Sequence, residues 1–212
     1  MNTFAQPHGA RDETLARLRS ALKQAAPCKS VPAGPLFAPV ADLMERFLAE
    51  SAANYMEVLR PQNEDETAAA LRQVLASLPA GEIFVQDTPE LRSLAAAAGD
   101  RPVRWSSEGG PVESSQATVT LCEALVALTG SVLVSSGCGG RGASVVAPCH
   151  IVVAKAEQLA PDLEAALARA REIAFDHSYV GLITGCSRTS DIEKLLVIGA
   201  HGPRRLVVIV RG

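Results

Sequence analysis

Apolar residues recur at helical spacing near the start of the chain. Three leucines between residues 12 and 26 lie on one face of a predicted helix, and Asp12 can cap its first turn. Residues 27–39 hold four prolines and a glycine, a composition typical of a linker or an extended strap. Residues 1–39 are therefore predicted to form a helical arm and a Pro-rich strap that docks on the main domain or on a partner.

From residue 40 onward, stretches with helical periodicity alternate with short apolar runs typical of buried strands. Helices are predicted over residues 40–53, 64–77, 88–98, 161–174 and 191–198, and a helical turn over 123–127. Strands are predicted over residues 55–59, 82–86, 103–105, 117–121, 131–135, 150–154, 179–184 and 206–210. Asn63 stands where it can cap the second of these helices.

This alternation predicts a largely parallel sheet with helices on both faces. Strands between residues 117 and 154 follow one another too closely for crossover helices, because a parallel pair needs a dozen or more connecting residues. Local antiparallel pairing is expected there. The predicted fold class for residues 40–212 is therefore α/β, a three-layer α/β/α domain with a mixed, mostly parallel sheet.

Composition and charge narrow the possible partners. Of 212 residues, 48% are hydrophobic, which is enough for a sizeable core. Because only 4% are aromatic, this core is expected to consist mainly of Ala, Val, Leu and Ile. The formal net charge is −3 without a Lys/Arg cluster, which argues against nucleic-acid binding. The sequence shows neither the ~20 apolar residues of a membrane span nor the pattern of a secretory signal. A cytoplasmic location is expected.

The cysteine pattern argues against a metal or disulfide framework. The chain has an odd number of cysteines and no C-x-x-C pair. A zinc site or a cysteine-ligated cluster is not expected in this chain, so no metal and no cofactor is assigned to it. Most of the cysteines are expected to be small buried hydrophobes. They are Cys28, Cys122, Cys138, Cys149 and Cys186.

Residues 137–142, G-C-G-G-R-G, formally match the G-x-G-x-x-G pattern of dinucleotide-binding folds. That pattern needs its third glycine to open a helix, whereas A-S-V-V-A-P follows here and leaves no room for one. Two interpretations remain open. The segment is either a tight, mobile turn between two strands, or a loop with exposed backbone N–H groups that lines a ligand cleft, with Arg141 as an anion contact.

The segment Y-V-G-L-I-T-G-C-S-R-T-S-D is the most informative part of the chain. A buried strand is predicted to end at Gly185, and the polar turn that follows leads into a helix from Asp191, capped by Thr189 or Ser190. Hydroxyls, an arginine and helix N–H groups at the carboxyl end of a strand are typical of an anion site. Alternatively, the hydroxyls only cap the helix and Arg188 pairs with an acid of its first turn.

The same segment carries a family resemblance. G-C-S-R-T-S-D-I-E-K-L-L-V-I-G-A-H-G-P resembles the G-P-S-R-T-A-D-I-E … G-x-H-G-P signature of the LUD domain, the family of lactate-utilisation protein C. The stretch L-T-G-S-V-L-V-S-S-G-C-G-G-R-G-A-S-V-V-A-P-C-H-I-V-V is similar to the E-T-G-T-L-V-L … H-I-V-V block of that family. The resemblance covers roughly residues 40–212.

The resemblance implies a fold similar to the NagB/RpiA/CoA-transferase group and a role beside two iron–sulfur proteins that oxidise L-lactate to pyruvate. Iron–sulfur clusters are then expected on those partners. Leu128 stands where the family often has an acid, which leaves Glu123 as the nearest carboxylate. Cys186 stands where the family usually has proline, and it is either a thiolate activated at a helix start or a passive replacement.

The leading hypothesis is a subunit or accessory protein of an L-lactate-oxidising system. It would bind a small anionic ligand or a partner at the 137–142 and 185–191 loops. The alternatives are a free-standing enzyme of CoA-transferase or sugar-phosphate isomerase type and a non-catalytic scaffold. No catalytic residue is assigned, and His201 is either a proton donor or acceptor or a structural residue. The ligand-binding candidates are Gly137, Gly139, Arg141, Gly185, Cys186, Ser187, Arg188, Thr189, Asp191 and His201.

Overall fold

The computed structural model describes residues 8–24, 34, 37–173, 176–190, 196–198 and 202–212. The chain divides into two compact units, Met1–Leu36 and Phe37–Gly212. The first unit contains helix α1, His8–Gln24, whose Leu18 and Leu22 are exposed. The predicted N-cap at Asp12 is wrong, because α1 begins four residues earlier and Asp12 lies inside it.

The second unit is built on a six-stranded sheet in which every pair of neighbouring strands is parallel. Its order is β1-β12-β7-β4-β2-β3. The apolar runs that predicted these strands are mostly buried on both faces, as in a parallel sheet between two layers. The strands are β1 Met56–Leu59, β2 Ile83–Val85, β3 Val103–Trp105, β4 Ala117–Thr120, β7 Cys149–Lys155 and β12 Arg205–Arg211.

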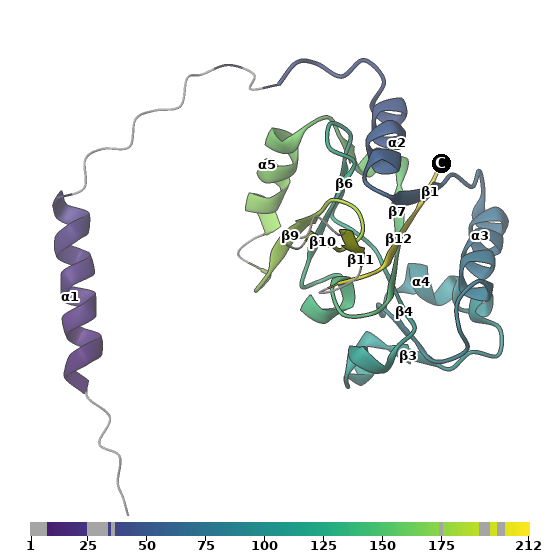
Figure 1. The fold of residues 1–212 in the computed structure, drawn as a ribbon, viewed down its shortest axis with the longest axis horizontal. Coiled ribbons are helices and arrows are strands. Elements are labelled where there is room, and N and C mark those ends of the chain that lie inside the picture. Colours follow the sequence, from purple (N-terminus) through teal and green to yellow (C-terminus); the bar gives the residue numbers. More distant parts are fainter. Residues whose placement is uncertain (1–7, 25–33, 35–36, 174–175, 191–195, 199–201) are drawn as a thin grey trace, which may run out of the picture. The chain divides into compact units, whose positions relative to one another are not determined.

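One face of this sheet is covered by α3 (Glu64–Ala76), α4 (Pro89–Ser93) and the short 3-10 helix η1 (Ala95–Ala98), as Figure 1 shows for α3 and α4. The side chain of Asn63 accepts a hydrogen bond from the Glu66 N–H at 2.9 Å, which confirms the predicted cap. The helix predicted over 88–98 divides into α4 and η1. Leucine and valine side chains from α3 and α4 pack on the sheet and form one hydrophobic core.

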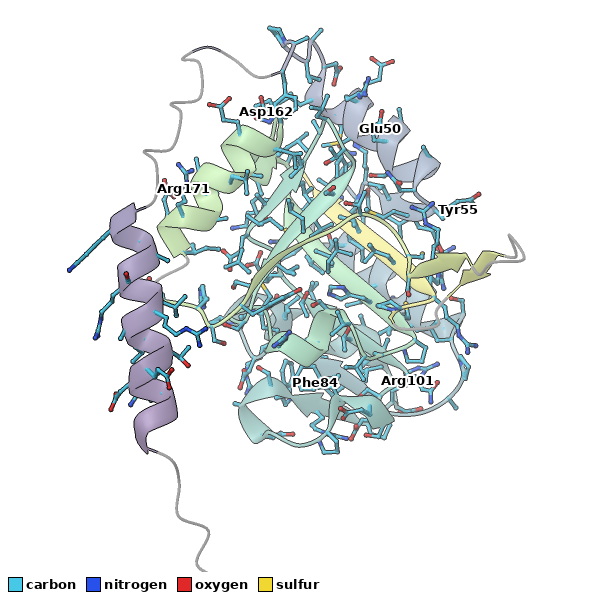
Figure 2. The ribbon with its side chains drawn as sticks, turned by 60° about the vertical axis from the view of Figure 1, so that its left-hand side comes forward. Glu50, Tyr55, Phe84, Arg101, Asp162 and Arg171 are labelled. Atoms are coloured by element: carbon cyan, nitrogen blue, oxygen red, sulfur yellow. The ribbon has the colours of Figure 1, made fainter. Side chains whose placement is uncertain are left out.

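The other face is covered by α2 (Leu43–Ala53) and by a second sheet with the order β8-β5-β6-β9. Helix α5 (Leu163–Ile173) contacts β5 and β8 of this second sheet. Figure 2 shows Asp162 just before α5 and Arg171 in its last turn. The strands are β5 Ala124–Val126, β6 Ser131–Ser135, β8 Leu159–Ala160 and β9 Val180–Ile183. The predicted α/β class with mostly parallel strand pairing is confirmed, and the antiparallel pairs of the second unit's four-stranded sheet are β5–β6 and β6–β9.

The predicted helical turn over 123–127 is wrong, because β5 occupies Ala124–Val126. All three of its residues are buried, and they pair antiparallel with β6. Burial on both faces of a short apolar run fits a sheet, whereas a helical turn would expose one side. The antiparallel pairing expected between residues 117 and 154 therefore exists, but it lies in the second sheet.

The helix predicted over 191–198 is also wrong where the structure describes the chain. Arg188–Ser190 forms β10 and Leu196–Ile198 forms β11, and the two strands pair antiparallel. Thr189 and Ser190 therefore lie in a strand. The β-branched residues in both segments favour the extended conformation. Residues 191–195 lie outside the described part. The remaining short 3-10 helices are η2 Ser106–Glu108, η3 Val112–Ser114, η4 Arg141–Ser144 and η5 Ala156–Gln158.

Candidate functional site

The glycine-rich loop after β6 uses its own backbone donors. The N–H of Gly137 donates to Ser135 Oγ at 3.0 Å, and the N–H groups of Cys138, Gly139 and Gly140 donate to carbonyls of residues 135–137. Gly139 and Gly140 have φ values of 81° and 91°, a region that glycine adopts without strain. The expected set of exposed N–H groups is therefore already bonded at these four positions.

Gln86 holds the loop against the main sheet. It follows the carboxyl end of β2 and is buried. Its Nε2 donates to the Gly137 carbonyl at 2.8 Å, and its Oε1 accepts from the Leu121 N–H at 2.7 Å. A buried side-chain amide whose N–H group and carbonyl oxygen are both hydrogen-bonded holds the two bonded backbone segments in place. Gln86 thus ties the loop to the carboxyl end of β4.

Glu123 lies directly beneath this loop. Its Oε1 accepts a hydrogen bond from Ser135 Oγ at 2.6 Å and a weaker one from Cys138 Sγ at 3.7 Å. Burial is the main cause that raises the pKa of the Cys138 thiol, so this residue is a thiol donor. Glu123 follows β4 of the parallel sheet, at the edge where α/β proteins place their ligands.

Residues 177–179 run beside the loop. A side chain at Gly137 would lie 2.7 Å from Cε1 of His177, so the imidazole rests on the glycine. The Ser178 N–H donates to Ser136 Oγ at 3.1 Å. The guanidinium of Arg141 lies 5.3 Å from the centre of the Tyr179 ring and is exposed. The Glu123 cluster is defined here as Glu123, Ser135, Gly137, Cys138 and His177, with Arg141 at its rim.

The family signature around Gly185 forms a different cluster, called here the Arg188 corner. Arg188 Nη2 donates to Asn54 Oδ1 at 3.1 Å, and its guanidinium lies 5.3 Å from the centre of the Tyr55 ring. Cys186 Sγ donates to the Tyr55 carbonyl at 3.1 Å. A Cβ at Gly185 would collide with the Asn54 carbonyl, and φ there is 83°, so only glycine fits. Figure 2 shows Tyr55 on the side where strands β10 and β11 lie.

The two clusters stand at opposite ends of β9. Ser135 pairs with Val180 at the start of the strand, whereas Val132 pairs with Ile183 at its end, just before Gly185. Those three steps of strand span about 10 Å. The structure therefore places Gly137 beside Glu123 through Ser135, with Gly139 and Arg141 further along the same loop, and places Gly185, Cys186 and Arg188 at the other end of β9. Open α/β proteins place their ligands at the carboxyl ends of the parallel strands. β9 belongs to the second sheet, so this rule does not apply to the residues that follow it. It applies to Glu123, which follows β4 of the parallel sheet.

Of the remaining predicted residues, Ser187 and Thr189 are described by the structure, whereas Asp191 and His201 are not. The Ser187 N–H donates to the Pro203 carbonyl at 2.9 Å, and Ser187 lies against Gly202. Thr189 belongs to β10. Leu128, at the position where the resemblance has an acid, lines a cavity of about 450 Å³ beside the start of α2.

The cysteines described by the structure are buried and free, as expected. Burial is the main cause that raises the pKa of Cys149 to about 12 and the pKa of Cys122 further. Among the described residues, no three His, Cys, Asp or Glu side chains are grouped so that they could hold a metal ion. In the same part of the chain, no helix is long and apolar enough to cross a membrane.

His150 is a buried polar residue near the start of β7 in the main sheet. It is 0% exposed, and its Nε2 lies 2.9 Å from Thr120 Oγ1. Its register partner Thr118 on β4 is equally buried. Burial lowers the pKa of His150 to about 4, because the charged imidazolium would lose its hydration. The ring is therefore neutral at physiological pH.

Together, these features define an α/β protein with a polar cluster at the carboxyl edge of its parallel sheet. The LUD domain matches residues 44–210, which is most of the chain. The chain belongs to the LUD domain family.

Relatives and a solved structure agree with this assignment. "Lactate utilization protein C" of Deinococcus radiodurans is 27% identical over the full length of both chains. The protein of the same name from Geobacillus thermodenitrificans is 28% identical and is matched over 68% of each chain. A crystal structure of a DUF162 family protein from Deinococcus radiodurans superposes with a TM-score of 0.60 at 18% identity. It covers 80% of this chain and 96% of its own. At that identity the structural likeness shows the fold.

Sequence reasoning missed part of the Glu123 cluster. Ser135 ends β6 directly before the glycines, so its position beside the loop was a usable signal. His177, and Gln86 which holds the loop, are 40 and 51 residues from Gly137. Nothing local marks them, because the pairing of β2 with β4 and of β9 with β6 brings them to the loop.

Proposed function

We propose that this chain takes part in lactate utilisation, as a component that binds a small carboxylate and works with iron–sulfur partner proteins. The observation that carries the proposal is the full-length match to a protein named for lactate utilisation. A match over all of both chains supports a shared role better than a match to one segment.

The Glu123 cluster is the ligand site in this proposal. It lies at the carboxyl ends of β2 and β4, and it combines a carboxylate, a hydroxyl and an imidazole from three elements. Arg141 is an exposed cation whose only described ring contact is with Tyr179. A guanidinium can bind a carboxylate through two parallel hydrogen bonds. Arg141 is therefore assigned as the residue that binds the carboxylate of the ligand.

The iron–sulfur partners follow from the same proposal. Oxidation of lactate to pyruvate releases two electrons and two protons. The electrons would pass to iron–sulfur clusters on the partner proteins, and the protons would leave to solvent. In this arrangement the chain binds and orients the acid, and the redox centres belong to the partners.

The experiment is reconstitution. The full chain is mixed with candidate iron–sulfur partner proteins, and lactate-dependent reduction of an artificial electron acceptor is followed. The expected result is reduction that needs lactate, the partners and this chain together. Equal reduction without this chain would rule out the proposed role.

A second candidate function is acyl transfer on the same site. It is favoured by one observation, the carboxylate of Glu123 beneath the glycine loop. A carboxylate in such a position can attack the carbonyl carbon of a thioester, which forms an acyl anhydride with Glu123 and breaks the C–S bond, so that the thiol leaves. Turnover of a small acyl-thioester by the isolated chain, abolished by Glu123→Gln, would support this function in place of the first.

A further inference from the structure

The hydrogen bonds of the Glu123 cluster run in one direction. The Gly137 N–H donates to Ser135 Oγ at 3.0 Å, and Ser135 Oγ donates to Glu123 Oε1 at 2.6 Å. A hydroxyl carries a single hydrogen. Ser135 has therefore used its hydrogen on Glu123, and it has no donor left to offer a ligand.

Glu123 is the end of this chain of donors. A carboxylate only accepts hydrogen bonds. Its Oε1 takes both Ser135 and Cys138, and within the described residues no hydrogen bond reaches Oε2. Glu123 is half-buried and so is partly exposed to solvent. The free capacity of the cluster at this point is therefore that of an acceptor.

We infer that the Glu123 cluster selects an α-hydroxy acid over the matching α-keto acid. A ligand hydroxyl can donate to Glu123 Oε2, whereas a ketone oxygen would direct its lone pairs at a carboxylate. The ligand carboxylate is repelled by Glu123, so it lies toward Arg141 and His177. The inference rests on the proposed function, and it assigns Glu123 as the residue that reads the hydroxyl.

Sites that hydrogen-bond a substrate hydroxyl discriminate strongly against analogues without a donor. A hydrogen bond to a charged group corresponds to about ten-fold or more in affinity. Removal of the hydroxyl, as in propionate, and its oxidation, as in pyruvate, should therefore both weaken binding. Each change acts on the same atom of the ligand and leaves the carboxylate intact.

The test is calorimetric titration of the full chain with L-lactate, pyruvate and propionate. Lactate is expected to bind at least about ten-fold more tightly than either analogue. Glu123→Gln should reduce the preference over pyruvate to less than about three-fold, because the amide can donate to a ketone. Glu113→Gln removes an exposed carboxylate from η3 and should leave the preference unchanged.

Equal affinities of the unmodified chain for lactate and pyruvate would overturn the inference, while lactate-dependent electron transfer in the reconstituted system would keep the proposed function. Absence of that electron transfer would remove the function whatever the acids bind. If Glu123→Gln does not fold, as judged by circular dichroism, the lactate-to-pyruvate ratio of the unmodified chain decides alone.

Discussion

At the scale of residues, several polar side chains in and beside the main sheet are buried. His150 and Thr118 face the same side of neighbouring strands, and Gln86 joins the loop to β4. His150 Nδ1 and Thr118 Oγ1 have no protein partner among the described residues. Burial of such groups in a sheet lowers stability unless they stay neutral and bonded. The neutral state of His150 is therefore part of the fold's stability.

His150 makes stability depend on pH. Its pKa is lowered to about 4 in the folded chain, against about 6.5 in the unfolded chain, so unfolding takes up a proton between these values. The free energy of unfolding should fall by about 3 kcal/mol as pH drops from 6.5 to 4. His150→Gln should lose this contribution. Urea unfolding at several pH values measures it, and an equal slope in both proteins would contradict it.

From the sequence, Glu123 could be identified only as the carboxylate nearest to Leu128. Its partners could not be read from spacing, because Ser135 and Cys138 reach it through the β5–β6 hairpin. The glycines of the loop were visible as a motif, but their bonded N–H groups were not. Local sequence shows residue types, whereas donor and acceptor roles depend on the folded partners.

At the scale of elements, strand positions of the main sheet were largely predictable, because continuous apolar runs bounded by turn residues are distinctive. β3 and β6 match their predicted limits. The errors lie at β5 and at β10–β11, where each segment is only three residues long. Helical and strand periods cannot be told apart over three residues, so tertiary pairing decided both cases.

The turn between β5 and β6 packs directly on α2. Gly130 has a φ of 59°, and a Cβ there would lie 2.5 Å from the backbone N of Ser51. Gly140 has a φ of 91°, but a Cβ there would meet nothing within 4 Å. A side chain at Gly130 would therefore meet both backbone strain and a collision with α2, whereas a side chain at Gly140 would meet backbone strain alone.

Gly130→Ala should destabilise the protein by about 3 kcal/mol or more, because strain and collision with α2 add. Gly140→Ala should cost only about 1–2 kcal/mol, from strain alone. Urea unfolding of both variants measures the difference. Similar losses for the two would show that the β5–β6 turn does not press on α2.

At the scale of the whole molecule, the second sheet separates the two polar regions. β9 runs between them, with the Glu123 cluster at its start and the Arg188 corner at its end. The family signature thus contacts the junction of α2 and β1, through Asn54 and Tyr55, while the proposed ligand site lies at the edge of the parallel sheet. A signature in sequence need not lie at the ligand.

Two arginines test this division most directly. Arg141 stands at the rim of the Glu123 cluster, and Arg188 belongs to the other end of β9. Calorimetric titration of L-lactate into Arg141→Ala and Arg188→Ala compares them under one condition. Arg141→Ala should bind lactate about ten-fold or more weakly, and Arg188→Ala should stay within about two-fold of the unmodified chain. The reverse result would place the ligand at the Arg188 corner and contradict the assigned site.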